Sequence, residues 1–247
     1  MGRPKRIKFF NEEIYYHIMS KTSGGYFLLR KEKNKEKFLE ILFHLLKGFC
    51  FKLEAFVVMN NHFHILIKSL KVDKLSDEEI LRKATSAKIF KKWVMLKNTE
   101  ILRKKLCDIS EFTKMLKEKF SKWFNKKYNR TGYFWGGRFK SVILEDGEAV
   151  EMCKKYIEMN PVKAGITEKA NSYKFSSAYK NEENFDKLEM TFDEKLWDHG
   201  IIIGSENFLL KLHNKYGTKY KLKNRKNYAR MGTKIKSLIN SRKSYRT

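Results

Sequence analysis

Several residue types are scarce in this chain of 247 residues, and each scarcity excludes a class of protein. The three cysteines, Cys50, Cys107 and Cys153, form no Cys-x-x-Cys pair, so neither a zinc ribbon nor a disulfide framework is indicated. No apolar run approaches the roughly 18 residues of a membrane-spanning helix. The basic N-terminal residues lead into no apolar signal core. A reducing cytoplasm is therefore the expected setting.

Acidic residues are also scarce. Lysine and arginine total 54 against 28 aspartates and glutamates, which gives a formal net charge of +26. Such a field favours polyanions, of which nucleic acid is the usual one and an anionic membrane surface another. No acidic residue lies between Lys211 and Thr247, a composition typical of a disordered arm that binds nucleic acid through its backbone or only aids solubility.

The spacing of apolar residues predicts the order strand, helix, strand, strand, helix, strand, helix. This order matches an α+β fold with a ferredoxin-like antiparallel sheet and helices on one face. We expect one domain over residues 1–180, with a helical insertion at about 72–107, and a C-terminal extension with a basic tail over 181–247. The expected elements are strands at 14–20, 51–59, 63–67 and 138–144, and helices at 34–47, from 108 onward, and at 148–159.

Local signals support several of these boundaries. Gly48 is expected to end the first helix, and Asn60-Asn61 to turn a hairpin. The sequence from Asp108 to Glu111 fits a capping box at the start of the next long helix. Pro161 is expected to end the last helix, because the residue before a proline avoids the helical region.

The tripeptide His62-Phe63-His64 is the first candidate for chemistry. Side chains alternate along a strand, so residues two apart point to the same side. Two imidazoles side by side provide half of a metal site. For an arbitrary pair of this kind, two histidines that only fill a sheet face are the commoner interpretation.

The last predicted helix carries a second pair of polar residues. Tyr156 and Asn160 are four residues apart, so they project from the same helix face. Taken alone, Tyr156 is most simply a half-buried core tyrosine, and Asn160 before Pro161 is most simply a helix C-terminal cap.

Four blocks of sequence, at 57–67, 132–141, 156–165 and 175–177, together resemble a known family. Their order and spacing are similar to those of the transposases that have a His-hydrophobic-His motif and one nucleophilic tyrosine. Within that family, the IS200-like transposases, the chain most resembles the REP-associated tyrosine transposases, whose genes accompany repeated extragenic palindromes in bacteria. The resemblance covers about residues 8–180.

The resemblance implies an HUH endonuclease fold and a bacterial, cytoplasmic, nucleoid-associated protein, either monomer or homodimer. It implies single-stranded or hairpin DNA as the substrate and a divalent metal, Mg²⁺ or Mn²⁺, as the cofactor. His62 and His64 would be metal ligands, and Asn160 matches the polar residue that completes the metal shell. Tyr156 matches the nucleophile, which forms a covalent phosphotyrosine and leaves a free 3′-hydroxyl.

Residues around the fourth predicted strand, and one residue after the last predicted helix, complete the expected DNA contacts. Arg138, Lys140 and Lys163 are candidates for phosphate contacts, although a solvated strand edge explains the first two equally well. Trp135 or Phe134 would offer a stacking face for an unpaired base.

The chain also departs from the family at two positions. Family members often have Gln where this chain has Gly136, which removes a side-chain contact, and commonly Pro where it has Asn60, which alters the turn.

Three other functions stay open at this point. A DNA- or RNA-binding protein could keep the fold and lose catalysis. A related HUH enzyme could start rolling-circle replication or conjugation, although such enzymes often carry two tyrosines or a helicase domain, and no phosphate-binding glycine-rich loop is present. A metal-dependent hydrolase that uses only water is the most distant alternative.

Overall fold

The structure is a computed structural model that describes residues 8–180, 202–205, 207–208, 211–212 and 228–229. Its centre is an antiparallel sheet in the order β2-β3-β1-β4, which is the strand order of a ferredoxin-like fold. Two short strands, β5 and β6, extend the sheet beyond β4 in parallel. The strands are β1 Tyr15–Lys21, β2 Phe51–Val58, β3 His62–Ser69, β4 Lys140–Leu144, β5 Ile202–Ile203 and β6 Tyr228–Ala229.

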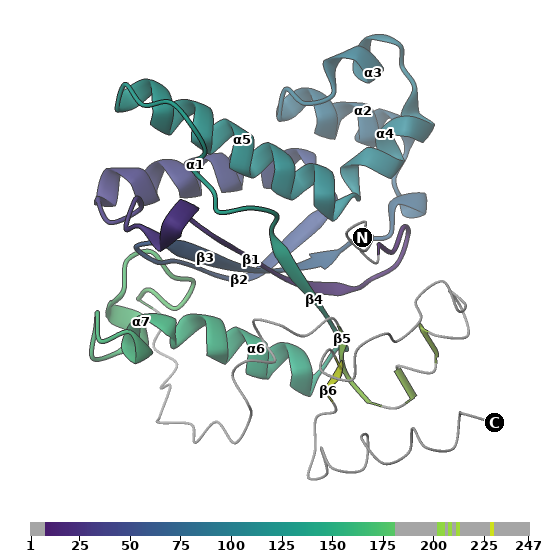
Figure 1. Cartoon of the computed structure of the whole chain (residues 1–247). Coiled ribbons are helices and arrows are strands. Elements are labelled where there is room, and N and C mark those ends of the chain that lie inside the picture. The colour runs from purple at the N-terminus through teal and green to yellow at the C-terminus, as the bar shows by residue number, and fades with distance from the viewer. Residues whose placement is uncertain (1–7, 181–201, 206, 209–210, 213–227, 230–247) are drawn as a thin grey trace, which may run out of the picture.

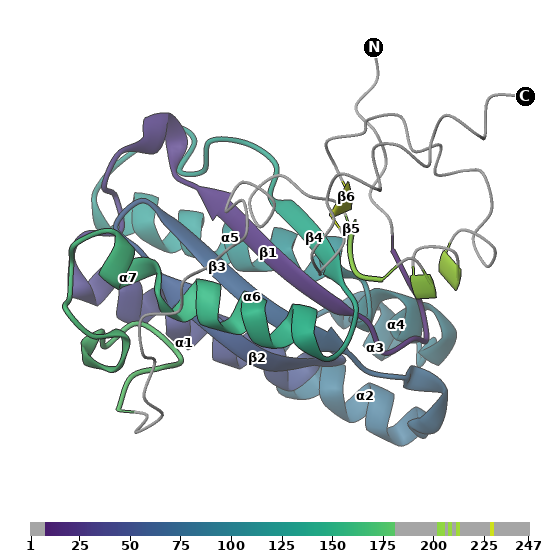
Figure 2. The ribbon, with the colours of Figure 1, turned by 90° about the horizontal axis from the view of Figure 1, so that it is seen from below.

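Helices cover both faces of this sheet (Figure 1 and Figure 2). Helices α1 Glu32–Gly48 and α5 Ile109–Lys127 lie on one face, and α6 Glu148–Glu158 lies on the other, against β2 and β3. The α+β ferredoxin-like fold is thus confirmed, and its two crossover helices do share one face. Helices are expected on one face only, and α6 departs from this expectation because it covers the opposite face. The apolar stripe of a helix predicts that the helix is buried, but it does not say which face of the sheet the helix covers.

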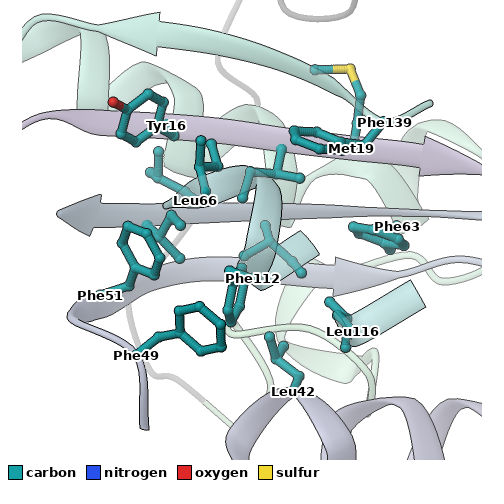
Figure 3. Close-up of a cluster of buried hydrophobic side chains, with 14 of the residues drawn as sticks. Tyr16, Met19, Leu42, Phe49, Phe51, Phe63, Leu66, Phe112, Leu116 and Phe139 are labelled. Carbon is teal, nitrogen blue, oxygen red and sulfur yellow. The ribbon is translucent and has the colours of Figure 1, made fainter. Parts of the chain in front are cut away.

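The face under α1 and α5 is an apolar, largely aromatic core. The Phe38 ring of α1 lies 4.8 Å from that of Phe63 on β3 and 5.5 Å from that of Phe120 on α5. Figure 3 shows more of the buried cluster, in which Phe49 packs 5.3 Å from Phe112. Burial of a large aromatic side chain contributes about 1.5–3 kcal/mol, so this face supplies much of the fold's stability.

The expected insertion is helical and packs on α1 through its first helix, α2. Gly48 is the last residue of α1, and a Cβ atom there would lie 2.4 Å from the Cβ of Ala87. Gly48 therefore allows the insertion to pack closely against the end of α1. It does not adopt the left-handed conformation of a glycine that caps a helix. The insertion consists of η2 Val72–Lys74, α2 Asp77–Ser86, α3 Lys91–Met95 and α4 Thr99–Leu106.

One helix-start prediction needs correction. Asp108 caps α5 by accepting a bond from the Ser110 amide, but its expected capping-box partner, Glu111, instead pairs with Lys105. The full capping box occurs at the start of α2, between Ser76 and Glu79. Both places satisfy amide groups that a helix start leaves without partners.

The remaining boundaries follow the sequence closely. After α6, Pro161 lies in the first turn of a further short helix, α7 Asn160–Lys163, where a proline needs no amide hydrogen. The other short elements are η1 Ser23–Gly25 and η3 Ala170–Ser172. The domain boundary at 180 stays a prediction, although Ile202 and Ile203 of the expected extension pair with β4. Most of the basic tail lies outside the described residues.

Candidate functional site

The His62-Phe63-His64 tripeptide opens β3 and divides between the two faces of the sheet. Phe63 faces the aromatic core under α1, whereas His62 and His64 face α6. The two imidazole centroids are 5.1 Å apart. His64 is buried and His62 half-buried, so the pair lies at the boundary between the protein interior and solvent.

A third histidine, which sequence reasoning missed, completes this cluster. His17 lies on β1, and its Nε2 atom is 2.9 Å from Nδ1 of His64. The two rings stack with their centroids 5.0 Å apart, and His17 has no exposed surface. The only signal in the sequence is one imidazole within the apolar run from Ile14 to Met19. The strand register that brings His17 to His64 is a long-range property, which no local pattern predicts.

Hydrogen bonds engage the Nδ1 atoms of both β3 histidines. Oδ1 of Asn61 lies 2.6 Å from Nδ1 of His62, and the Asn61 Nδ2 atom donates to the Gly25 carbonyl, which fixes the direction of the amide. Since an amide oxygen only accepts, Nδ1 of His62 carries the proton and Nε2 carries the lone pair that can bind a cation. Nδ1 of His64 is engaged with Nε2 of His17, so Nε2 is the His64 nitrogen that stays outside this contact.

Burial keeps the inner histidine neutral. It lowers the pKa of His64 well below its usual range, and the neighbouring His17, His62 and Lys21 lower this pKa further. Neutral imidazole is the form that binds metals. The site therefore holds His64 ready for a cation at physiological pH.

Helix α6 docks beside these histidines and presents Tyr156 to them. The Tyr156 ring makes edge contacts with His64 and His17, at centroid distances of 5.7 and 6.0 Å. Nζ of Lys163, on α7, lies 5.2 Å from the centre of the same ring. A buried phenol is thus held between two imidazoles and one ammonium group.

Asn160 uses its amide nitrogen within the helix end, and its role as a metal ligand stays a prediction. Its Nδ2 atom donates to the Tyr156 carbonyl at 2.8 Å, as in the helix C-terminal cap that the sequence also allowed. Among the described residues, no group of three or more His, Cys, Asp or Glu side chains is placed to hold a metal ion. The histidine pair alone fits a divalent cation. Within the described residues, no third His, Cys, Asp or Glu side chain joins the pair as a ligand.

A pocket of about 310 Å³ opens beside the two histidines. Its walls include His62 and His64, the basic side chains of Lys21, Arg138 and Lys140, and glycines at 24, 25, 136 and 137. Two predicted phosphate contacts, Arg138 and Lys140, therefore share one pocket with the two predicted metal ligands. Cationic walls and small glycines together suit an anionic group that closely approaches the backbone.

Trp135 and Phe134 do not offer the expected stacking face. Trp135 is 8% exposed, its Nε1 donates to the Lys117 carbonyl, and its ring packs 5.4 Å from that of Phe63. Phe134 is 1% exposed and packs 5.0 Å from Phe120. Both belong to the aromatic core, because the chain here runs antiparallel beside the end of β1, with a bridge between Trp135 and Thr22.

The local packing explains why residue 136 is a glycine. Its amide donates to the Lys21 carbonyl, and a Cβ atom at this position would lie 2.9 Å from the Thr22 carbonyl oxygen. A side chain such as glutamine would require the strand end to shift. Gly136 therefore permits a close contact between this loop and the end of β1.

No helix in the described part of the chain is long and apolar enough to cross a membrane.

Comparisons with known proteins complete these observations. A search of curated proteins found no match. A solved REP-associated tyrosine transposase bound to a REP hairpin is 15% identical, with a TM-score of 0.48, over 71% of this chain and 82% of that one. A protein from Deinococcus radiodurans R1 described as a transposase is also 15% identical, with a TM-score of 0.36, over 62% of this chain and 95% of that one. The family model described as "Transposase IS200 like" matches residues 11–106 and 101–160, which is more than half of the sequence. The chain therefore belongs to the IS200-like transposase family.

Proposed function

We propose that this transposase is a metal-dependent endonuclease and strand transferase that acts on single-stranded or hairpin DNA through Tyr156. The observation that carries the proposal is the edge contact between Tyr156 and His64, 5.7 Å between ring centroids, beside a basic pocket. Family membership accounts for DNA processing in general. The contact supports the finer mechanism, because the proposed nucleophile, Tyr156, lies next to the candidate cation site.

The residues that would hold a divalent ion are His62 and His64, each through Nε2. The ion, Mg²⁺ or Mn²⁺, would polarise the phosphodiester when bound. Asn160 would contribute through Oδ1, since its Nδ2 is held by the Tyr156 carbonyl. His17 is a positioning residue in this scheme, because its bond to Nδ1 of His64 holds that nitrogen and fixes the plane of the ring.

The covalent step balances without an external energy source. The Tyr156 oxygen attacks phosphorus, the bond from phosphorus to the 3′ oxygen breaks, and the phenolic proton is transferred to give a free 3′-hydroxyl. The phosphotyrosine retains the energy of the diester bond, so the reverse reaction can join strands. Lys163 above the ring favours the developing phenolate electrostatically.

The basic residues beside the site would bind the DNA strand. Lys21, Arg138 and Lys140 line the pocket, and the whole chain carries a formal charge of +26. Contacts of this kind hold the backbone and fix its position without reading sequence. Binding should therefore weaken steeply as salt is raised.

The test is a covalent-adduct assay with Tyr156→Phe and, as the matched control, Tyr133→Phe, which alters an exposed tyrosine. Wild type and the control should form a protein–DNA adduct with hairpin DNA and Mn²⁺, and Tyr156→Phe should form none while it still binds the DNA. Replacement of His62 and His64 by Ala should abolish metal-dependent cleavage. Cleavage by Tyr156→Phe at the wild-type rate would contradict the mechanism.

A second candidate is a DNA- or RNA-binding protein that keeps the fold without catalysis. The engagement of Asn160 with the Tyr156 carbonyl favours it, since this bond is what a purely structural helix end would form. Binding of hairpin DNA without any adduct, with either Mg²⁺ or Mn²⁺ present, would establish this function in place of the first.

A further inference from the structure

Two large aromatic side chains are exposed just after β1. Tyr26 is 68% exposed and Phe27 is 63% exposed, although both belong to the described, well-packed part of the chain. Single exposed apolar residues are common on protein surfaces. Two consecutive aromatic residues beside a basic pocket instead indicate a binding surface.

The segment that carries them is fixed by hydrogen bonds. The Thr22 hydroxyl donates to the Tyr26 carbonyl at 2.6 Å, and Nδ2 of Asn61 donates to the Gly25 carbonyl at 3.1 Å. The Leu29 amide donates to the Asn60 carbonyl at 2.9 Å. These bonds tie Tyr26 to the turn that leads directly into His62, so the ring is presented from a defined backbone position.

The Tyr26 ring lies against the wall of the pocket. A Cβ atom on Gly24 would be 2.5 Å from Cε2 of this ring, so only glycine allows the ring to lie there. Gly24 itself lines the pocket together with His62 and Arg138, and its φ of 62° is a conformation that glycine adopts without strain. The exposed ring therefore packs directly on a residue of the pocket wall.

The two surfaces complement the two parts of a nucleotide. Lys21, Arg138 and Lys140 in the pocket suit a phosphate, and an exposed phenol ring at its edge suits the flat face of a base. Bases in a duplex are already stacked on each other, so only an unpaired base has a face to offer.

We infer that Tyr26 is a stacking platform for one unpaired base of the DNA strand whose phosphate occupies the pocket. This inference rests on the proposed function, because its ligand is the DNA strand of that function. It adds that the platform selects a single-stranded segment beside the proposed nucleophile. It replaces the stacking role expected of Trp135 and Phe134, which are buried. Phe27, the adjacent exposed ring, is not required by the inference.

The test measures DNA affinity in the variants Tyr26→Ala and Tyr26→Trp. The probe is a DNA hairpin with oligothymidine single-stranded flanks, with metal chelated so that no cleavage occurs. Tyr26→Ala should lower the affinity about five- to 100-fold, the range for loss of one base–aromatic stack, and Tyr26→Trp should restore it. Tyr179→Ala, an exposed tyrosine on the segment that covers β2, is the matched control and should leave the affinity unchanged.

An abasic scan identifies the stacked base. One abasic site is moved along the flanks, and the position that lowers the affinity of wild type most is identified. An abasic site at that position should not lower the affinity of Tyr26→Ala further, because both changes remove the same contact. A fully paired duplex of equal length should bind wild type and Tyr26→Ala equally. Additive effects at every abasic position would overturn the inference.

The outcomes separate this inference from the function on which it rests. If wild type forms the Tyr156 adduct and Tyr26→Ala binds the hairpin as tightly as wild type, the platform is wrong and the proposed function stands. If wild type binds the hairpin without any adduct, and Tyr26→Ala weakens that binding, the platform stands and the nuclease mechanism fails. If wild type does not bind the hairpin, both fail.

Discussion

The two faces of the sheet differ in what they bury. The face under α1 and α5 buries an aromatic cluster around Phe38, Phe63 and Phe120. The face under α6 buries His17 and His64, and the Tyr156 ring makes edge contacts with both. Imidazoles placed away from water reduce stability unless they are hydrogen-bonded, so the aromatic face supplies the stability that lets the opposite face carry reactive groups.

The same comparison explains how a single strand serves both purposes. In β3, Phe63 points to the aromatic core while its neighbours His62 and His64 point to α6. A register shift of one residue would exchange these faces completely. The strong apolar preference of Phe63 therefore fixes the orientation of the two histidines.

The largest effect should come from the aromatic face. Phe120→Ala should lower the free energy of unfolding by about 3–5 kcal/mol, because it removes a fully buried ring that contacts Phe38, Phe134 and Trp135. Urea unfolding followed by circular dichroism measures this change. Tyr156→Phe, on the other face, should change the same quantity by less than about 1 kcal/mol. Similar losses for the two variants would remove the distinction between the faces.

The next effect tests His17 as a positioning residue. His17→Leu removes the bond to Nδ1 of His64 and should weaken Mn²⁺ binding about 10- to 100-fold. Calorimetric titration measures the affinity, and nitrogen NMR of the imidazoles should show the His64 tautomer becoming mixed. His17→Gln, whose amide can still hydrogen-bond, should recover part of the affinity. His44→Gln on α1 is the control, and an unchanged tautomer in His17→Leu would show that His17 only fills space.

Stability should depend on pH through the face under α6. The pKa of His64 is lowered in the folded protein, whereas in the unfolded chain it is near the ordinary value of about 6.5. Below that pH the unfolded chain binds a proton that the folded protein does not, so the free energy of unfolding should fall as the pH decreases, by at most about 1.4 kcal/mol per pH unit for this group. Metal-free urea unfolding between about pH 7 and about pH 5 measures the slope. His64→Gln should flatten it and His44→Gln should not.

The smallest effect concerns Lys163. Lys163→Gln removes the ammonium group above the Tyr156 ring, a contact of about 0.5–1 kcal/mol at an exposed site, and should slow adduct formation about two- to fivefold. Single-turnover kinetics with hairpin DNA measures the rate. Lys174→Gln, which alters an ion pair with Glu36 on α1, is the matched control. A loss equal to that of Tyr156→Phe would show that Lys163 takes a direct part in the reaction.

The sequence was sufficient for the order of elements and for the two halves of the site. Periodicity identifies each strand and crossover helix because it reflects burial within one element. The placement of His62 and His64 on one face follows from strand alternation alone. What could not be predicted is which face α6 covers, since an apolar stripe does not say against what it packs.

Two further differences have the same origin. His17 reaches His64 only through the register of β1 on β3, in which Met19 lies opposite His64. The burial of Trp135 depends on the bridge to Thr22, more than 100 residues earlier in the sequence. In both cases, residues distant in the sequence determine the environment of a side chain. A local sequence pattern does not contain this information.

The covered outer edge of β2 has a consequence for self-association. This strand carries an irregularity between Leu53 and Ala55. Beyond it, the backbone of Phe56 and Val58 bonds to the segment 175–177. An open strand edge is a template on which a second copy can add its own strand. Since the part of this edge from Phe56 to Val58 is already hydrogen-bonded within the chain, a second copy cannot add a strand along it, and this part of the border resists edge-to-edge aggregation.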